Sequence, residues 1–197
     1  KIYFIEYKLK FFSIKMMLMK NFLVFFLMLF ICIVNLSSIN SRSIASIKKE
    51  YRNLVMVGFS MGGAMTLNYL GKNGMNIPPQ VKAAIAFSTP CDLKEGAEIL
   101  NLRSNTVYRN RFLRNLKKKI LIKGQEFPGL IDLKKLQEIR EWRDFDEHFS
   151  APLNNYKDAE DFYFNSSAKN FMEKIQIPTL LVNAQNDPIL TPSCTPT

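Results

Sequence analysis

The residues best suited to chemistry in this chain are a serine and its neighbours between two glycines. Residues 58–62 read Gly-Phe-Ser-Met-Gly, directly after an apolar run and directly before a helical pattern. A serine on a sharp turn from strand to helix is lifted clear of the sheet, and neighbouring glycines permit its strained backbone. The Ser60 hydroxyl is therefore a candidate nucleophile. The backbone N–H of Met61, at the helix start, is a candidate donor to an oxyanion formed on an ester carbonyl.

The same five residues also have a purely structural interpretation. A G-x-S-x-G pattern is expected by chance in roughly one chain in twenty of this length. A serine that caps a helix after a glycine-rich turn would give the same pattern. In either case the glycines at positions 58 and 62 are expected to let strand and helix approach closely. The strand before the motif and the helix after it favour the catalytic interpretation.

The elements expected to position Ser60 are strands of a parallel sheet. Strands are predicted at residues 51–59, 81–87 and 179–182. A helix is predicted from Met61 to Leu70, with Gly71 or Gly74 as its stop. The first two strands are nearly continuous apolar runs, which is typical of parallel sheets covered on both faces. Their strand–helix–strand order predicts a right-handed βαβ unit.

A long helical insertion is predicted between the second and third strands. Residues 91–172 are polar, charged and mostly helical by pattern, with expected breaks at Gly124, residues 128–129 and Pro152. The fold class is therefore α/β, with a helical lid inserted into a parallel sheet. Seven aromatic residues of the lid could line an acyl pocket, although packing within the lid is favoured for most of them: Trp142, Phe145, Phe149, Tyr156, Phe162, Tyr163 and Phe164.

The net charge of +10 does not by itself indicate a nucleic-acid partner. Residues 1–50 carry eight Lys/Arg and two Glu, whereas residues 51–197 carry nineteen Lys/Arg and fifteen acids. Most of the excess therefore lies outside the part with the serine motif, and no nucleic-acid partner is expected. The densest basic stretch, residues 109–119, predicts an amphipathic helix with Phe112, Leu113 and Leu116 inward. A solvated outer face is favoured, and contact with anionic lipid or substrate is the alternative.

The first fifty residues differ from the rest of the chain. They contain no glycine or proline, and residues 22–34 form an unbroken apolar run between basic and small polar flanks. Three interpretations stay open: a signal-peptide-like stretch, a marginal membrane anchor, or a segment that is not native and has the composition of A/T-rich codons. If native, it predicts membrane contact through residues 11–36 and membrane association. Residues 51–197 form the expected α/β domain, which alone would be cytoplasmic.

Cysteine and glycine spacing predicts no metal or cofactor. Cys32, Cys91 and Cys194 are odd in number and far apart, which gives neither a disulfide framework nor a zinc pattern. The glycines fit neither a dinucleotide-binding fingerprint nor a phosphate-binding loop.

Several stretches of residues 53–196 resemble the YheT-type α/β-hydrolases, a group of predicted carboxylesterases. The matching stretches occur in order at residues 57–63, 86–93, 108–116, 143–146, 151–153, 157–161, 177–184 and 186–188. The resemblance is partial, because the early strands and the histidine segment that follows the acid in this family have no counterpart here. It implies a partial α/β-hydrolase fold.

The resemblance also implies a Ser–Asp–His triad in that chain order. Ser60 matches the nucleophile and Asp187 matches the acid that orients the histidine, although Asn186 stands where the family usually has a first aspartate. Without the resemblance, Asp187 would be read as a turn residue before proline. The only histidine, His148, precedes Asp187 and is expected to be solvated or to cap a helix. No glycine precedes Gly58, so the loop that usually supplies the second oxyanion donor is also unmatched.

The expected function is hydrolysis of carboxylic esters, with a small-molecule or lipid ester as substrate and no cofactor. Because the triad histidine is unmatched, two alternatives remain open for these 197 residues. One is a non-catalytic truncated hydrolase or pseudo-hydrolase. The other is a membrane-anchored interaction protein.

Overall fold

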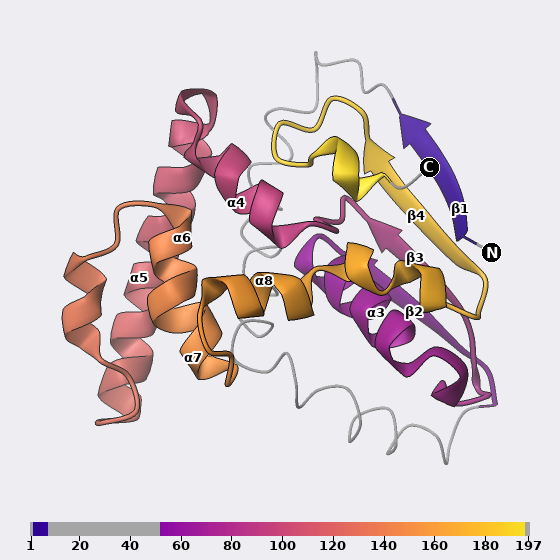
Figure 1. The fold of residues 1–197 in the computed structure, drawn as a ribbon, viewed down its shortest axis with the longest axis horizontal. Coiled ribbons are helices and arrows are strands. Elements are labelled where there is room, and N and C mark those ends of the chain that lie inside the picture. The colour runs from indigo at the N-terminus through magenta and orange to yellow at the C-terminus, as the bar shows by residue number, and fades with distance from the viewer. Residues whose placement is uncertain (1, 8–51, 196–197) are drawn as a thin grey trace.

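A four-stranded parallel sheet forms one end of the molecule, and a group of helices forms the other (Figure 1). The computed structural model describes the backbone of residues 2–7 and describes residues 52–195 in full. The strands are β1 (Ile2–Tyr7), β2 (Leu54–Phe59), β3 (Val81–Phe87) and β4 (Thr179–Ala184). Their order across the sheet is β1-β4-β3-β2, and every neighbouring pair is parallel. The carboxyl ends of all four strands therefore lie at one edge of the sheet.

The predicted βαβ unit is present. Helix α3 (Met61–Asn73) follows β2 at once and leads through a short 3-10 turn to β3. Gly74, with φ of 50°, ends this helix as predicted, because a positive φ suits glycine at a helix end. Gly71 lies inside the helix, where a Cβ would come within 2.3 Å of the Phe171 carbonyl oxygen. Gly71 therefore serves a close approach and not a helix stop.

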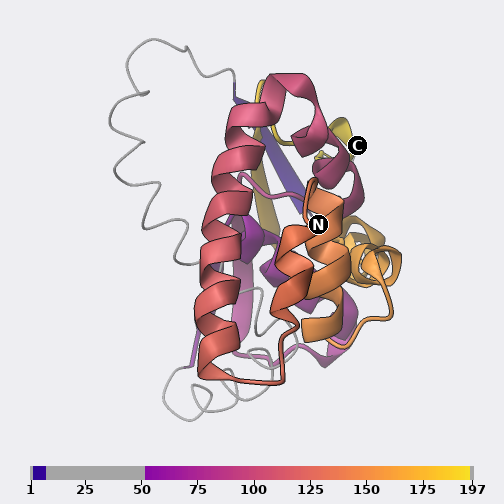
Figure 2. The same cartoon turned by 90° about the vertical axis from the view of Figure 1, so that its left-hand side faces the viewer.

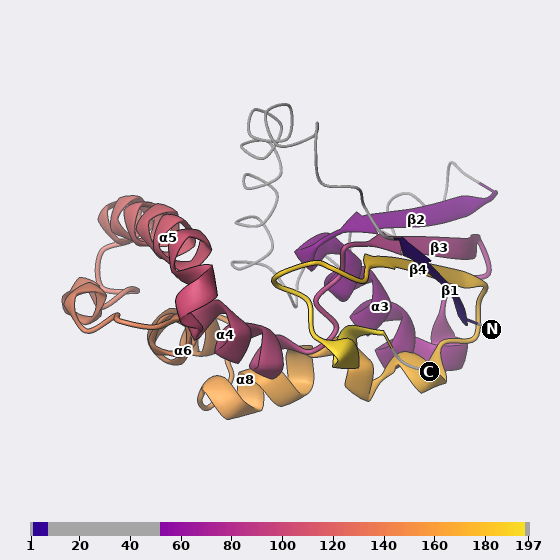
Figure 3. The same cartoon turned by 90° about the horizontal axis from the view of Figure 1, so that it is seen from above.

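The region between β3 and β4 is helical, as expected. Its helices are α4 (Leu93–Asn101), α5 (Thr106–Glu126), α6 (Trp142–Phe145), α7 (Ala151–Leu153) and α8 (Ala159–Ser166). A π-helical turn joins α6 to α7 at residues 146–150, and 3-10 turns lie at residues 103–105, 133–137, 168–170 and 172–174. A further 3-10 turn, at residues 192–194, follows β4. Figure 3 shows α5 and α6 at one side of the molecule and the sheet with α3 at the other.

One predicted break in this region is wrong. Helix α5 continues through Gly124, which is buried, and Leu133 packs where a Cβ at this position would lie. The glycine admits a packing contact, and the helix ends at Glu126, before the predicted break at residues 128–129. Pro152 lies in α7, which continues the π-helical turn directly and ends one residue later, at Leu153.

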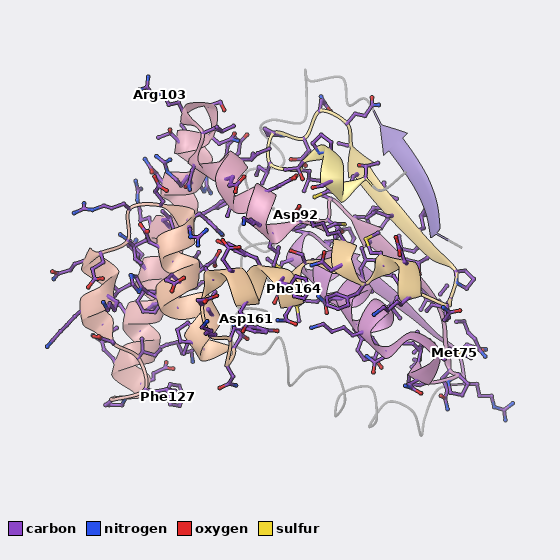
Figure 4. The ribbon with its side chains drawn as sticks, in the orientation of Figure 1. Met75, Asp92, Arg103, Phe127, Asp161 and Phe164 are labelled. Carbon is purple, nitrogen blue, oxygen red and sulfur yellow. The ribbon has the colours of Figure 1, made fainter. Side chains whose placement is uncertain are left out.

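Three hydrophobic clusters hold these elements. The first lies between the sheet and α3, around Leu67, Leu70 and Leu181. The second joins α5 to the turn around Phe145 and Phe149, and the third joins α4 to α8. Packing within the helical region is thus confirmed for most of its aromatic residues, whereas Phe164 is exposed (Figure 4).

The sheet was expected to have both faces covered. Within residues 52–195 only the face toward α3 is covered, because alternate residues of β2 on the other face stay exposed. Val55, Val57 and Phe59 are all about half exposed. β1 was not predicted, because residues 2–7 belong to the segment that composition set apart.

Candidate active site

Ser60 stands on a strained turn between β2 and α3. Its φ of 52° and ψ of −122° place a non-glycine residue in a region that L-amino acids rarely adopt. Two backbone hydrogen bonds hold this turn. The Ser60 N–H donates to the Phe87 carbonyl at 2.8 Å, and the Ser60 carbonyl accepts from Ala64 N–H at 3.1 Å. Strain of this kind persists only where the surroundings fix it, and it gathers at functional sites.

Glycine at position 58 makes this turn possible. A Cβ on Gly58 would lie 2.5 Å from the Gly62 carbonyl oxygen and 2.6 Å from the Gly63 Cα atom. Strand and helix are therefore in direct backbone contact at Gly58, as predicted. The prediction is wrong for Gly62, where a Cβ would meet nothing within 4 Å. The close approach occurs instead at Gly63, because a Cβ there would overlap the Thr89 hydroxyl at 2.1 Å.

Met61, the predicted oxyanion donor, is the first residue of α3, so its N–H lies in the first turn of the helix. The first N–H groups of a helix have no partner within the helix. They also lie at the positive end of the helix dipole. Ser60, immediately before α3, makes no side-chain cap hydrogen bond to it, so its hydroxyl is not used as a helix cap.

Asp187 lies in the loop after β4, at the same sheet edge as Ser60. Its N–H donates to the Ala184 carbonyl at 3.2 Å, and its Oδ1 accepts from Ile189 N–H at 2.9 Å. One strand, β3, lies between β2 and β4, so the two strand ends are about 10 Å apart. An imidazole with a hydrogen bond at each nitrogen joins a hydroxyl and a carboxylate about 8 Å apart, a separation that side chains at two such strand ends can reach.

His148 does not fill that gap. It lies in the π-helical turn of the helical region, where its Nε2 is 3.4 Å from a Glu138 carboxylate oxygen. The histidine predicted to be solvated or capping is thus partly buried and paired with an acid of the same region.

A buried network ties the loop after β4 to the end of β3. The Asn183 side chain accepts from Thr89 N–H at 2.8 Å and donates to the Cys194 carbonyl at 2.9 Å. Ser88, directly after β3, has a φ of 47° and is a second strained residue at this edge. Sequence reasoning did not select Asn183 or Ser88, because each acts through contacts with residues far away in the chain.

Cys91 and Cys194, far apart in the sequence, meet in this network. Both are buried free thiols, and the Cys91 N–H donates to the Cys194 sulfur at 3.2 Å. The hydrogen bond from the Cys91 thiol lowers the pKa of Cys194 to about 5, while the same bond and burial raise the pKa of Cys91. The spacing of the cysteines had suggested no relation between them.

Asp92 joins the helical region to the loop after β4 (Figure 4). Its carboxylate caps α4 by accepting from Lys94 and Glu95 N–H groups, and it also accepts from Lys169 and from Ser193. The carboxylate raises the pKa of Lys169 through this hydrogen bond. Within residues 52–195, no group of histidine, cysteine and acidic side chains is arranged to hold a metal ion.

Comparisons with known proteins agree with this architecture. Residues 48–195 match the family described as the alpha/beta hydrolase fold. The chain is 34% identical over 136 residues to the YheT esterase of Escherichia coli strain K12, covering 68% of this chain and 39% of that protein. It is 32% identical over 150 residues to a monoacylglycerol lipase of Saccharomyces cerevisiae, covering 71% and 32%. It is 31% identical over 137 residues to phospholipase ABHD3 of Mus musculus, covering 69% and 33%.

The chain spans about a third to two fifths of the length of these relatives. No solved structure matches it significantly. The family match covers most of the chain and coincides with the described sheet, the serine turn and the helical region. The chain therefore belongs to the α/β-hydrolase family and, within it, is similar to the YheT-type esterases.

Proposed function

We propose that this chain carries the nucleophile and the acid of a serine hydrolase that cleaves carboxylic esters. The observation that supports the proposal most is the placement of two strand ends. Ser60 follows β2 on a strained turn into α3, and Asp187 follows β4 at the same edge, one strand away. The names of the relatives, an esterase and two lipid hydrolases, agree with this chemistry.

In the proposed reaction, the Ser60 hydroxyl attacks the ester carbonyl while a base removes its proton. The oxyanion that forms accepts a hydrogen bond from the Met61 N–H. The proton then passes to the departing alcohol, and water cleaves the acyl–serine ester in a second round. The base in this reaction is a histidine imidazole, which Asp187 orients. No step of this sequence calls for a metal or a cofactor.

The proposed substrates are esters with an apolar acyl part, including lipid esters. Phe59 and Phe87, which flank the Ser60 turn, stack with ring centroids 5.0 Å apart at the carboxyl ends of β2 and β3. Their rings offer an apolar surface beside the nucleophile. Membrane contact through residues 11–36 lies outside the described residues and stays a prediction. Within the described part of the chain, no helix is both long and apolar enough to cross a bilayer.

A non-catalytic role for these 197 residues is the second candidate. It is favoured by one observation, that the single histidine pairs with Glu138 in the helical region. A serine without a base at its side is a weak nucleophile. Loss of a triad member lowers turnover by a factor on the order of 10⁴–10⁶.

Chemical rescue separates the two candidates. Hydrolysis of p-nitrophenyl butyrate is measured with increasing imidazole, and the rate of Ser60→Ala is subtracted at each concentration to remove the attack by imidazole itself. The hydrolase proposal predicts little turnover without imidazole and a Ser60-dependent rate that rises with it. A rate that is identical in the two proteins at every concentration would contradict the proposal and support the non-catalytic role.

A further inference from the structure

Helix α5 concentrates the positive charge of the domain. It carries seven lysines and arginines and one acid, Glu126, whereas the rest of residues 51–197 carries twelve basic and fourteen acidic residues. The net charge of residues 51–197 is thus positive only because of this helix. Figure 2 shows α5 as a long helix at the outer side of the helical region.

The buried side of α5 leaves the basic residues on its outer face. Phe112, Leu113, Leu116 and Ile120 are buried against the second hydrophobic cluster. Opposite them, Arg111, Arg114 and Lys118 are exposed at spacings of three and four residues, so they form one row along the helix.

This row of cations has no anionic partner among residues 52–195. The flanking basic residues do have partners: Lys117 donates to the Ile139 carbonyl, Arg109 to the Asn101 carbonyl, and Lys123 pairs with Glu126. No ion pair in this part of the chain involves Arg111, Arg114 or Lys118.

Exposed apolar side chains lie at both ends of the same face. Val107 is 78% exposed in the first turn, and Leu121 and Ile122 are about half exposed near the last turn. Phe127 and Leu130 extend this apolar surface beyond the helix end, as the position of Phe127 in Figure 4 shows. A partner that offered only phosphates would make no use of these apolar groups.

We propose that this outer face of α5, composed of Val107, Arg111, Arg114, Lys118, Leu121 and Ile122, docks on an anionic phospholipid surface. The cations lie against the headgroup phosphates, and the apolar side chains enter the boundary between headgroups and acyl chains. Both contributions are characteristic of helices that lie in the plane of a membrane surface. The inference goes beyond the proposed ester hydrolysis and does not depend on it.

Docking through α5 would also bring the candidate site near the lipid. Asn105, directly before α5, is buried and donates to the carbonyl of Pro188, the residue after Asp187. The start of the helix is therefore fixed to the loop that carries the proposed acid. A protein bound through α5 would hold the carboxyl edge of its sheet close to the membrane surface.

Co-sedimentation with vesicles tests this proposal on the full 197-residue chain. Binding is compared between phosphatidylcholine vesicles and vesicles that contain about one third phosphatidylserine. Each exposed cation near an anionic surface strengthens binding about fivefold. The triple variant Arg111→Glu/Arg114→Glu/Lys118→Glu should therefore bind the anionic vesicles at least a hundredfold more weakly than the parent.

Two further variants make the test specific. Arg52→Glu/Lys82→Glu/Lys174→Glu changes the charge by the same amount at exposed sites that are not part of α5 and should retain most of the binding. Leu121→Ser/Ile122→Ser should weaken binding several-fold at unchanged charge. Far-UV circular dichroism confirms folding of each variant. The proposal would be overturned if both charge variants lost the same amount of vesicle binding. It would also be overturned if the serine variant lost no vesicle binding and the parent bound single-stranded RNA as strongly as it binds the anionic vesicles.

Discussion

Gly58 is the residue on which the geometry of the Ser60 turn depends most. The backbone of the α3 start occupies the space that any side chain at position 58 would need, 2.5 Å from the Gly62 carbonyl oxygen. Backbone atoms cannot rotate away as a flexible side chain can. A larger residue at position 58 must therefore push the strand and the helix apart and move Ser60.

Gly58→Ala is expected to lower the free energy of unfolding by about 2–3 kcal/mol, because overpacking against backbone forces a shift of whole elements. Gly62→Ala is the matched control, since a Cβ there meets open space and alanine favours a helix by up to about 1 kcal/mol. Urea unfolding of the two variants measures the difference. Equal stabilities would show that β2 and α3 do not touch at Gly58.

Ser60 and the N–H that follows it were predicted from the sequence pattern, because they come directly after a recognisable apolar strand. Asp187 was predicted only through the family resemblance, because an aspartate before a proline is also a common turn residue. The different roles of Gly58, Gly62 and Gly63 could not be assigned, since they depend on which atoms face each glycine. The same holds for Asn183, whose partners Thr89 and Cys194 come from other parts of the chain.

At the scale of elements, one buried carboxylate connects the π-helical turn to α8. Asp146 is almost fully buried and accepts hydrogen bonds from the Ser150 hydroxyl at 2.5 Å and the Tyr163 hydroxyl at 2.8 Å. Burial raises the pKa of Asp146 to about 6, and these hydrogen bonds oppose that rise. Burial, together with the negative charge of Asp146, raises the pKa of Tyr163.

This carboxylate makes stability depend on pH in a defined direction. Since its folded pKa of about 6 lies above the ordinary value of 3.8, the folded state holds the proton more strongly, and stability is lost as the pH rises from about 4 to above 6. Between pH 5 and pH 7 the ionisation of this carboxyl group should lower the free energy of unfolding by about 1 kcal/mol. Chemical unfolding of the parent and of Asp146→Asn at both pH values measures this change. The parent should lose about that much stability between pH 5 and pH 7 beyond any loss that the variant shows. A parent and variant with the same pH dependence would refute this assignment.

The order of elements β2, α3, β3 and β4 followed from apolar runs and glycine positions. The predicted bounds of β3 are confirmed, whereas the start of β2 and the ends of α3 and β4 differ from the prediction by two or three residues. Continuation of α5 through Gly124 could not be predicted, because packing against Leu133 outweighs the low helix propensity of glycine. β1 was missed although residues 2–7 are mostly β-branched and aromatic, a composition that favours strands.

At the scale of the whole molecule, the sheet has two unlike faces within the described residues. α3 and the turns at residues 168–174 cover one face. On the other face, Val55, Val57 and Phe59 of β2 lie in register with Ala83, Ile85 and Phe87 of β3. β2 is also an edge strand of the described sheet, and an apolar strand at an edge invites pairing with other chains.

Val55→Thr/Val57→Thr is therefore expected to reduce self-association of the 197-residue chain severalfold. Threonine keeps the β-branched shape that favours a strand while it removes apolar surface. Met75→Gln is the matched control: Met75 is 90% exposed and lies in the turn after α3, away from this face (Figure 4), so its replacement should leave association unchanged. Light scattering during incubation at fixed concentration measures the effect. If both variants associate as fast as the parent, the exposed face of β2 is not the surface through which copies of this chain meet. If instead only the threonine variant stays dispersed, the sheet face and not the sum of scattered apolar side chains controls the solubility of the domain.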